Sequence, residues 1–266
     1  MRIGAVNYLN SKPLVYELEE RLPDAEISCD LPSRLADQLA SGRLDVALVP
    51  AIELARQPGW TIVSDACIGC RGPVLSVKLL FRVEPRRVRT LALDEGSRTS
   101  VVLAQILLSD FSSVRPELVP LPIGAEPETS TADAVLVIGD RAIRSAAEEF
   151  VEVWDLGDRW CRSTELPFVF AMWVARPAVA NDSLREALAE ARDAGCRHIS
   201  EIAYQQAAIM DLEVELVQEY LCDYLHFTLG PDERRGLEHF FQRAAELGLI
   251  ASAPEIQFDD CPVEHP

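Results

Sequence analysis

The polar run 94–100 (DEGSRTS) carries the residue types best suited to chemistry, and it stands between two apolar segments. Segment 88–93 has the pattern of a strand, and segment 101–108 has that of a helix. A glycine turn before a helix start presents free backbone N–H groups, and further donors come from Ser97, Arg98, Thr99 and Ser100. We interpret the run as a site for a carboxylate. Serine and threonine also cap helices that bind no ligand, so a capping role is the alternative.

A second polar pair, Asn10 and Ser11, follows the predicted strand 3–6. Pro13 is tolerated in the first turn of a helix, which places the pair between a strand end and a helix start. This is the edge of an open α/β sheet at which ligands usually bind. Helix capping by either side chain is again the alternative.

Four more residues are candidates for the same site. Ser76 lies inside an otherwise apolar run, and a buried serine needs a hydrogen-bond partner in the backbone or in a ligand. Gly139 and Asp140 follow the predicted strand 133–138, where Asp140 is also suited to cap the next helix. Phe168 belongs to the apolar strand 166–175 and would shield a ligand from water, although such strands usually form core.

The composition limits the classes of partner. The chain has 266 residues, of which 48% are hydrophobic, so it can bury one or two cores. Its formal net charge of -18 disfavours nucleic acids and anionic membrane surfaces as partners. Screening over about 8 Å still lets a few local donors hold a small anionic ligand. The sequence shows neither a signal-peptide pattern nor an apolar run long enough to span a bilayer, which predicts a cytoplasmic protein.

The seven cysteines favour reduced thiols over a disulfide framework, because their number is odd and their spacing irregular. Cys67 and Cys70 have the spacing of a redox or metal pair, but no second pair and no nearby histidine completes a zinc site. We therefore interpret them as incidental thiols and expect no metal site.

The order of the predicted elements indicates a parallel sheet. Strands at 3–6, 26–31 and 45–50 alternate with helical segments in a βαβαβ pattern. A second βαβ set begins at residue 88, after a break in the pattern. From residue 181 onward the chain reads as helical, and 253–266 reads as an acidic, proline-rich tail.

Two βαβ sets in succession predict two lobes. The chain would leave the first lobe near Ser76 and return near Phe168, which makes the second lobe an insertion. We set the bounds at 1–82 plus 175–266 for lobe 1 and at 83–174 for lobe 2. An exposed face on the C-terminal helices would allow a homodimer, although packing of these helices on lobe 1 is the preferred interpretation. One cleft between the lobes would then hold Asn10, Ser11, Ser76, residues 97–100 and Asp140.

Four runs together resemble a known family in order and spacing: 3–14 (IGAVNYLNSKPL), 94–100, 138–140 (IGD) and 166–173 (LPFVFAMW). They are similar to the chorismate dehydratase family of the futalosine route to menaquinone, with a looser similarity at 231–241. Glu165 departs from the family pattern, which usually has glycine before Leu-Pro-Phe, so the local turn is in question. The four histidines all lie at or beyond His198, whereas the sister enzyme that makes 1,4-dihydroxy-6-naphthoate relies on a histidine in the cleft.

The resemblance implies an α/β fold like the type II periplasmic binding proteins, with two lobes that close on a ligand. It also implies conversion of chorismate to 3-[(1-carboxyvinyl)oxy]benzoate with loss of water and without a cofactor. A dehydratase of this kind must supply donors for two carboxylates, and the helix start at 97–100 and the pair Asn10 and Ser11 are suited to that task. Candidates for the base are Asp140, Glu95 and the substrate's own enolpyruvyl carboxylate, of which we favour the last.

Other functions fit the same residues. A cytoplasmic sensor or carboxylate-binding protein would use the fold without catalysis, and the sister enzyme is a nearer alternative. A transporter-linked receptor is disfavoured, because we find no signal sequence or lipid-anchoring cysteine near residue 1.

Overall fold

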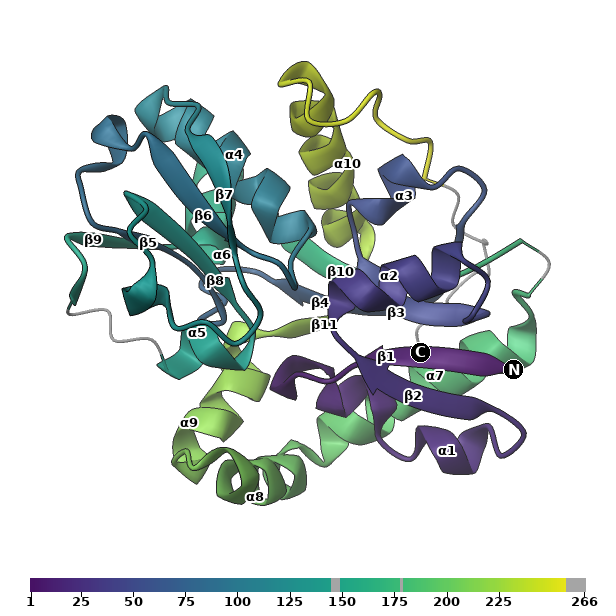
Figure 1. The fold of residues 1–266 in the computed structure, drawn as a ribbon. Coiled ribbons are helices and arrows are strands. Elements are labelled where there is room, and N and C mark those ends of the chain that lie inside the picture. The colour runs from purple at the N-terminus through teal and green to yellow at the C-terminus, as the bar shows by residue number, and fades with distance from the viewer. Residues whose placement is uncertain (145–148, 178, 257–266) are drawn as a thin grey trace.

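The structure is a computed structural model that describes residues 1–144, 149–177 and 179–256. Two sheets form the centres of two lobes that lie side by side (Figure 1). The predicted two-lobed α/β fold is therefore confirmed. The predicted tail lies outside the described residues from position 257 onward.

The sheet of lobe 1 has six strands in the order β11-β4-β10-β3-β1-β2. The strand β1 pairs in parallel with β2 and β3, as the βαβαβ pattern predicts. The strand β10 runs antiparallel between β3 and β4, so the sheet is mixed. The strands of this sheet are β1 Arg2–Val6, β2 Glu26–Asp30, β3 Val46–Pro50, β4 Thr61–Cys70, β10 Phe168–Ala175 and β11 His226–Thr228.

The sheet of lobe 2 has five strands in the order β7-β6-β8-β5-β9. The strand β6 is parallel to β7 and β8, whereas β5 is antiparallel to β8 and β9. The strands of this sheet are β5 Val77–Phe81, β6 Thr90–Asp94, β7 Glu117–Leu121, β8 Ala134–Ile138 and β9 Glu152–Asp155.

The chain passes from one sheet to the other, and back again, at earlier positions than the predicted bounds 83–174 of lobe 2. The strand β5 already belongs to the second sheet, and β10 already belongs to the first. The chain therefore crosses between β4 and β5 and returns between β9 and β10, near Ser76 and Phe168. The bounds missed these positions because β5 and β10 are mainly apolar, and an apolar run does not reveal which sheet it joins.

The helices cover the sheets and the junction between them. Lobe 1 carries α1 Leu18–Arg21, α2 Pro32–Ala40, α3 Glu53–Arg56, α7 Asp182–Arg197, α8 Ile199–Met210 and α9 Val214–Glu219. Lobe 2 carries α4 Thr99–Ser112, α5 Asp140–Arg144 and α6 Leu156–Thr164. The last helix, α10 Pro231–Glu246, packs against both β10 and α4 and so spans the two lobes (Figure 1). The C-terminal part is not purely helical as predicted, because β11 adds an edge strand to β4.

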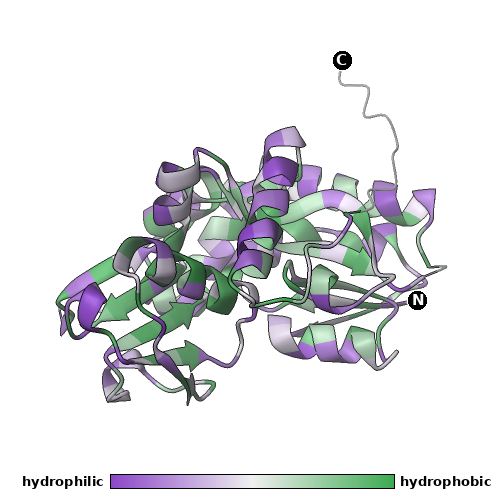
Figure 2. Cartoon of the chain, turned by 90° about the horizontal axis from the view of Figure 1, so that it is seen from above, coloured by the Kyte–Doolittle hydropathy of each residue, from purple (hydrophilic) through white to green (hydrophobic). Residues whose placement is uncertain are grey.

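Burial of apolar strands holds each lobe together. Every residue of β3, β8 and β10 is buried, as expected for strands covered on both faces. Hydrophobic residues gather on the strands, and hydrophilic residues mark the outer helices (Figure 2). No helix in the described part of the chain is long and apolar enough to cross a membrane.

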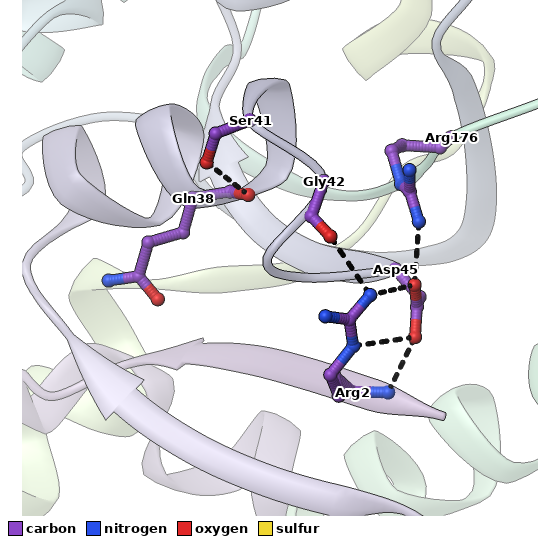
Figure 3. Close-up of polar contacts among 6 residues, drawn as sticks. All are labelled: Arg2, Gln38, Ser41, Gly42, Asp45 and Arg176. Atoms are coloured by element: carbon purple, nitrogen blue, oxygen red, sulfur yellow. Dashed lines mark hydrogen bonds and ion pairs between the residues drawn. The ribbon is translucent and has the colours of Figure 1, made fainter.

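A charged cluster joins the ends of three segments of lobe 1 (Figure 3). Asp45 Oδ1 accepts from Arg2 Nη2 at 2.8 Å and from Arg176 Nη2 at 2.7 Å, and the Arg2 backbone N–H donates to Asp45 Oδ2 at 2.9 Å. Arg2 begins β1, Asp45 precedes β3 and Arg176 follows β10. The hydrogen bonds from Arg2 lower the pKa of Asp45 below its usual range. The cluster links these three segments at the end of the sheet that lies opposite the carboxyl ends of β1 and β3.

Candidate active site

A cavity lies between the two lobes and encloses about 520 Å³ of space free of protein atoms, part of it open to solvent. Lobe 1 contributes Tyr8, Asn10 and Phe170, and lobe 2 contributes residues 96–100 and Gly139. Ser76 lines the cavity where the chain crosses between the lobes. The structure thus brings together most of the residues that the sequence placed in one cleft.

The start of α4 is open toward this cavity. No side chain caps the helix, whose first residues Thr99 and Ser100 line the wall. The first N–H groups of an α-helix lack partners within the helix and carry a partial positive charge. Asp94 closes the turn before the helix. Its carboxylate Oδ1 accepts from the Gly96 N–H at 2.9 Å, and its backbone carbonyl accepts from the Ser97 N–H at 3.0 Å. This geometry is suited to hold an anion.

The four polar side chains at the helix start divide into two pairs. Ser97 and Ser100 line the cavity with 9% and 5% of their surface exposed, and their hydroxyls make no hydrogen bond within the described residues. Thr99 Oγ1 instead accepts from the backbone N–H of Ile52 at 3.2 Å. Thr99 therefore links the two lobes, and the hydroxyls of Ser97 and Ser100 are free for a ligand.

Arg98 departs from its predicted role as a donor to the ligand. Its guanidinium pairs with Asp37 at 2.7 Å and with Glu53 at 3.2 Å, both in lobe 1. Glu53 is buried and also pairs with Arg56 at 3.0 Å. Arg98 lines the cavity, but its guanidinium is already ion-paired with carboxylates of the protein. The sequence alone does not show this, because the partners lie more than 40 positions away.

Asn10 and Ser11 have different roles. Asn10 lines the cavity, and its Oδ1 is buried without a hydrogen-bond partner among the described residues. The hydroxyl of Ser11 instead donates to the backbone carbonyls of Val6 and Tyr8, the latter at 2.9 Å, and it does not line the cavity. Ser11 therefore takes neither the place at the cavity nor the capping role that was the alternative, because the 3-10 helix Leu9–Val15 has no side-chain cap and the Ser11 hydroxyl binds backbone carbonyls, not N–H groups.

Ser76 reaches the cavity through a strained turn. Its N–H donates to the Val74 carbonyl at 2.6 Å, and Leu75 between them has a φ of +62°. A positive φ in a residue as bulky as leucine is costly and must be held in place by its surroundings. The carboxylate of Asp155 does so by accepting from the Val74 N–H at 3.0 Å and from the Leu75 N–H at 2.7 Å. Burial raises the pKa of Asp155.

Tyr8 also lines the cavity, although its residue type gave no signal of a ligand contact in the sequence. Its ring packs against Gly139, where an added Cβ would lie 3.0 Å from the ring carbons. Gly139 also has a φ of +65°, which favours glycine. The glycine therefore allows lobe 1 to approach lobe 2 closely. Burial raises the pKa of Tyr8, so its phenol stays protonated at neutral pH.

Asp140 and Phe168 do not line the cavity, contrary to prediction. Asp140 Oδ1 accepts from the Leu9 N–H at 3.1 Å and so joins the lobes, while burial raises its pKa. Phe168 packs in the core against Trp160 and Phe240. The register of β10 shifts between Val169 and Ala171, and Phe170 takes the place at the cavity that was expected for Phe168.

The wall of the cavity is poor in groups that transfer protons. Among the described residues that line it, none is Asp, Glu, His or Lys, and its charged member is Arg98. Cys67 and Cys70 are free thiols buried in β4. No group of three His, Cys, Asp or Glu side chains in the described part of the chain is arranged to hold a metal ion.

Residues 1–246 match a protein family described as menaquinone biosynthesis. A chorismate dehydratase of Thermus thermophilus is 32% identical over 265 residues, which cover 93% of this chain and 95% of that protein. The chain belongs to the menaquinone-biosynthesis family. A chorismate dehydratase of Campylobacter jejuni is 25% identical over 256 residues, covering 94% of this chain and all of that protein.

Solved structures place this menaquinone-biosynthesis family member among the periplasmic-binding-protein-like folds. A protein of Archaeoglobus fulgidus superposes with a TM-score of 0.76 at 17% identity, covering 94% of this chain and 98% of that one. The periplasmic aliphatic sulphonate binding protein of Escherichia coli superposes with a TM-score of 0.66 at 14% identity, covering 100% and 96%. These similarities confirm the predicted fold class.

Proposed function

We propose that the protein is a chorismate dehydratase that forms 3-[(1-carboxyvinyl)oxy]benzoate and water in the futalosine route to menaquinone. The two relatives with that name match nearly the whole chain. The observation that carries the proposal in the structure is the cavity, in which the uncapped start of α4 from lobe 2 and Asn10 from lobe 1 line one space. The rival roles of sister enzyme and sensor have no comparable support.

Chorismate carries two carboxylates, and the cavity offers donors for both. The open N–H groups of α4 and the hydroxyls of Ser97 and Ser100 suit the ring carboxylate, because a helix start favours a negative charge. Asn10 of lobe 1 and Ser76, at the crossing between the lobes, are further polar residues that line the space. Each lobe would thus hold one end of the substrate, and closure of the lobes would orient it.

The reaction removes the proton from the ring carbon that bears the ether oxygen. The electrons of that C–H bond move into the ring toward the ring carboxylate. The C–O bond to the hydroxyl on the neighbouring carbon then breaks, and the departing hydroxyl takes up one proton to form water, which balances the proton removed from the ring carbon. Donors on the ring carboxylate stabilise the charge that develops there. The product ring is aromatic, which supplies the driving force, so fixed donors suffice and no cofactor is needed.

The enolpyruvyl carboxylate of the substrate is our choice for the base. The described cavity wall has no carboxylate or imidazole, and Asp140 is engaged with the Leu9 N–H instead. A carboxylate fixed close to the proton gains effectiveness from its position alone. Phe170 and Ile68 would keep water away from the reacting carbons.

Incubation of the purified protein with chorismate tests the proposal. We expect the absorbance of chorismate to give way to that of a substituted benzoate, and mass spectrometry to identify the product. Unchanged chorismate would contradict the proposal. Binding without turnover would assign a sensor, and formation of 1,4-dihydroxy-6-naphthoate from the substrate of the sister enzyme would assign that enzyme. A cytoplasmic location and a homodimer stay predictions.

A further inference from the structure

A buried carboxylate lies directly behind the wall of the cavity. Asp94 ends β6, and 2% of its surface is exposed. Its Oδ1 accepts at 2.9 Å from the N–H of Gly96, which lines the cavity. A Cβ added to Gly96 would lie 3.2 Å from both Asp94 Oδ1 and the hydroxyl of Tyr8, another residue of the wall. A negative charge therefore lies close to a space in which the start of α4 is suited to hold an anion.

Arg141 of α5 balances that charge. Its Nη2 pairs with Asp94 Oδ2 at 2.5 Å, and its Nη1 donates to the Ala125 carbonyl. The same Asp94 oxygen accepts from the Ile138 N–H at 3.4 Å. Arg141 itself is not among the residues that line the cavity. Any effect of Arg141 on a ligand there must therefore pass through Asp94.

An unpaired carboxylate at this place would oppose the binding of an anion. Like charges a few Å apart in a partly buried site repel each other strongly, because little water screens them. Burial raises the pKa of the Tyr8 phenol, the charge of Asp94 raises it further, and the charge of Arg141 lowers it. Both charges therefore act at the cavity wall, with opposite signs.

We propose that Arg141 is a positioning residue that cancels the charge of Asp94, so that the carboxylate orders the turn before α4 without repelling an anionic ligand. The identity of that ligand as chorismate rests on the proposed function. The alternative is a purely structural pair that ties α5 to β6. The two roles differ in sign, because only the electrostatic role makes the loss of Asp94 compensate for the loss of Arg141.

The test compares Arg141→Met, Asp94→Asn and the double variant. Calorimetry measures the binding of isophthalate, a benzene dicarboxylate, and kcat/KM is measured with chorismate. We expect Arg141→Met to lower both affinity and kcat/KM about tenfold, because Asp94 is then unpaired beside the ligand. Asp94→Asn keeps an oxygen for the Gly96 N–H and removes the negative charge, so binding should be as tight as in wild type or tighter. The double variant should return to within about threefold of wild type, since the two residues act as one unit.

Two further variants serve as controls. Arg141→Lys keeps the positive charge and should bind isophthalate with a loss of less than about threefold. Arg159→Met breaks another ion pair of lobe 2, with Glu152 at 3.2 Å, and neither of these residues lines the cavity. It should leave both measurements unchanged.

Weaker binding in both single variants without recovery in the double variant would overturn the proposal, because a purely structural pair predicts that result. Unchanged binding in Arg141→Met would overturn it as well. If Arg141→Met does not fold, Asp94→Asn decides, and weaker binding in that variant contradicts the proposal. If the wild-type protein binds isophthalate but leaves chorismate unchanged, the proposed function fails and the affinities decide the role of Arg141. A wild-type protein that neither converts chorismate nor binds isophthalate contradicts both proposals.

Discussion

At the scale of single residues, the side chains at the start of α4 divide between those that face the cavity and those that contact the opposite lobe. The hydroxyls of Ser97 and Ser100 stay open to the cavity, whereas Arg98 and Thr99 bind groups of lobe 1. Four consecutive positions therefore combine free hydroxyls at the cavity with contacts to the opposite lobe. The sequence predicted all four residues as polar donors. The structure separates those that face the cavity from those that contact lobe 1.

Replacement of both serines tests their role as donors. We expect Ser97→Ala with Ser100→Ala to raise KM for chorismate about tenfold to a hundredfold, because each hydroxyl gives a hydrogen bond to a charged group. Unfolding stability should change little. Ser112→Ala is the control, since Ser112 is equally buried at the far end of the same helix. Equal kinetics of the double variant and the control would refute the assignment.

Asp140 gives a separate prediction about the base. Asp140→Asn keeps an oxygen that accepts from the Leu9 N–H, so we expect turnover to fall less than about tenfold. The loss of a true general base usually costs 10²–10⁴-fold. Single-turnover kinetics with saturating chorismate separate the two results. A protein that binds chorismate but loses nearly all turnover would return the role of base to Asp140.

The residue types of the site were predictable, but their individual roles were not. A polar residue at a strand end or helix start was correctly expected near the cleft, as for Asn10 and Ser97. Whether its side chain faces the ligand or the backbone depends on the local turn, and the 3-10 helix after β1 turned Ser11 away. Tyr8 escaped attention because aromatic residues usually belong to the core.

At the scale of elements, the end of α6 carries strain at the position where the sequence departs from the family pattern. Glu165 has a φ of +57°, and its N–H donates to the Cys161 carbonyl at 2.9 Å. Glycine is the usual residue in this left-handed position after a helix. The turn that the sequence put in question therefore forms with glutamate in a conformation that favours glycine.

Substitution of this residue should stabilise the protein. We expect Glu165→Gly to raise the free energy of unfolding by about 0.5–1 kcal/mol, because it relieves the steric cost of the left-handed conformation. Ser163→Gly, two positions earlier and inside α6, should lower it by a similar amount. Urea unfolding of both variants checks the signs, and a loss of stability in Glu165→Gly would contradict the assignment.

The cluster around Asp45 makes the ends of three segments sensitive to pH. The pKa of Asp45 is lowered, so its contribution to stability is present above the ordinary aspartate pKa of about 4 and is lost as pH falls through its own lower value. We expect Asp45→Asn to lose about 1 kcal/mol at pH 7, a small value because solvent screens part of the site. The difference from wild type should shrink below about pH 4. A difference that stays constant down to pH 3 would contradict this, with stability measured by urea unfolding at each pH.

At the scale of the whole molecule, polar contacts at separate points hold the lobes together over the cavity. Arg98 binds Glu53 and Asp37, and the Leu9 N–H donates to Asp140. The helix α10 adds a further contact to lobe 2, where Arg243 pairs with Asp110 of α4 at 2.6 Å. The described conformation is thus one in which the lobes are in contact.

Removal of the Arg98 ion pairs should shift the protein toward a more open form. We expect Arg98→Ala to increase the radius of gyration measured by X-ray scattering without ligand, because the pairs with Glu53 and Asp37 are lost. Arg56→Ala is the control, since it removes a partner of Glu53 within lobe 1 and leaves the contact between the lobes intact. Identical scattering from the two variants would show that Arg98 does not hold the lobes together.

The overall architecture was predictable because the βαβ pattern fixes parallel strands and two lobes follow from its repetition. The exact crossing points were not predictable, since β5 and β10 are mainly apolar and their residue types fit either sheet. The edge strand β11 was missed for another reason. It has three residues, too few to show an alternating pattern.

The central claim is that donors from both lobes hold one dianion in the cavity between them. A crystal structure with 3-[(1-carboxyvinyl)oxy]benzoate bound tests it most directly. We predict one carboxylate within hydrogen-bond distance of the first N–H groups of α4 and of Ser97 or Ser100, and the other end of the ligand against Asn10 and Ser76. A ligand bound outside this cavity, or held by one lobe alone, would contradict the claim.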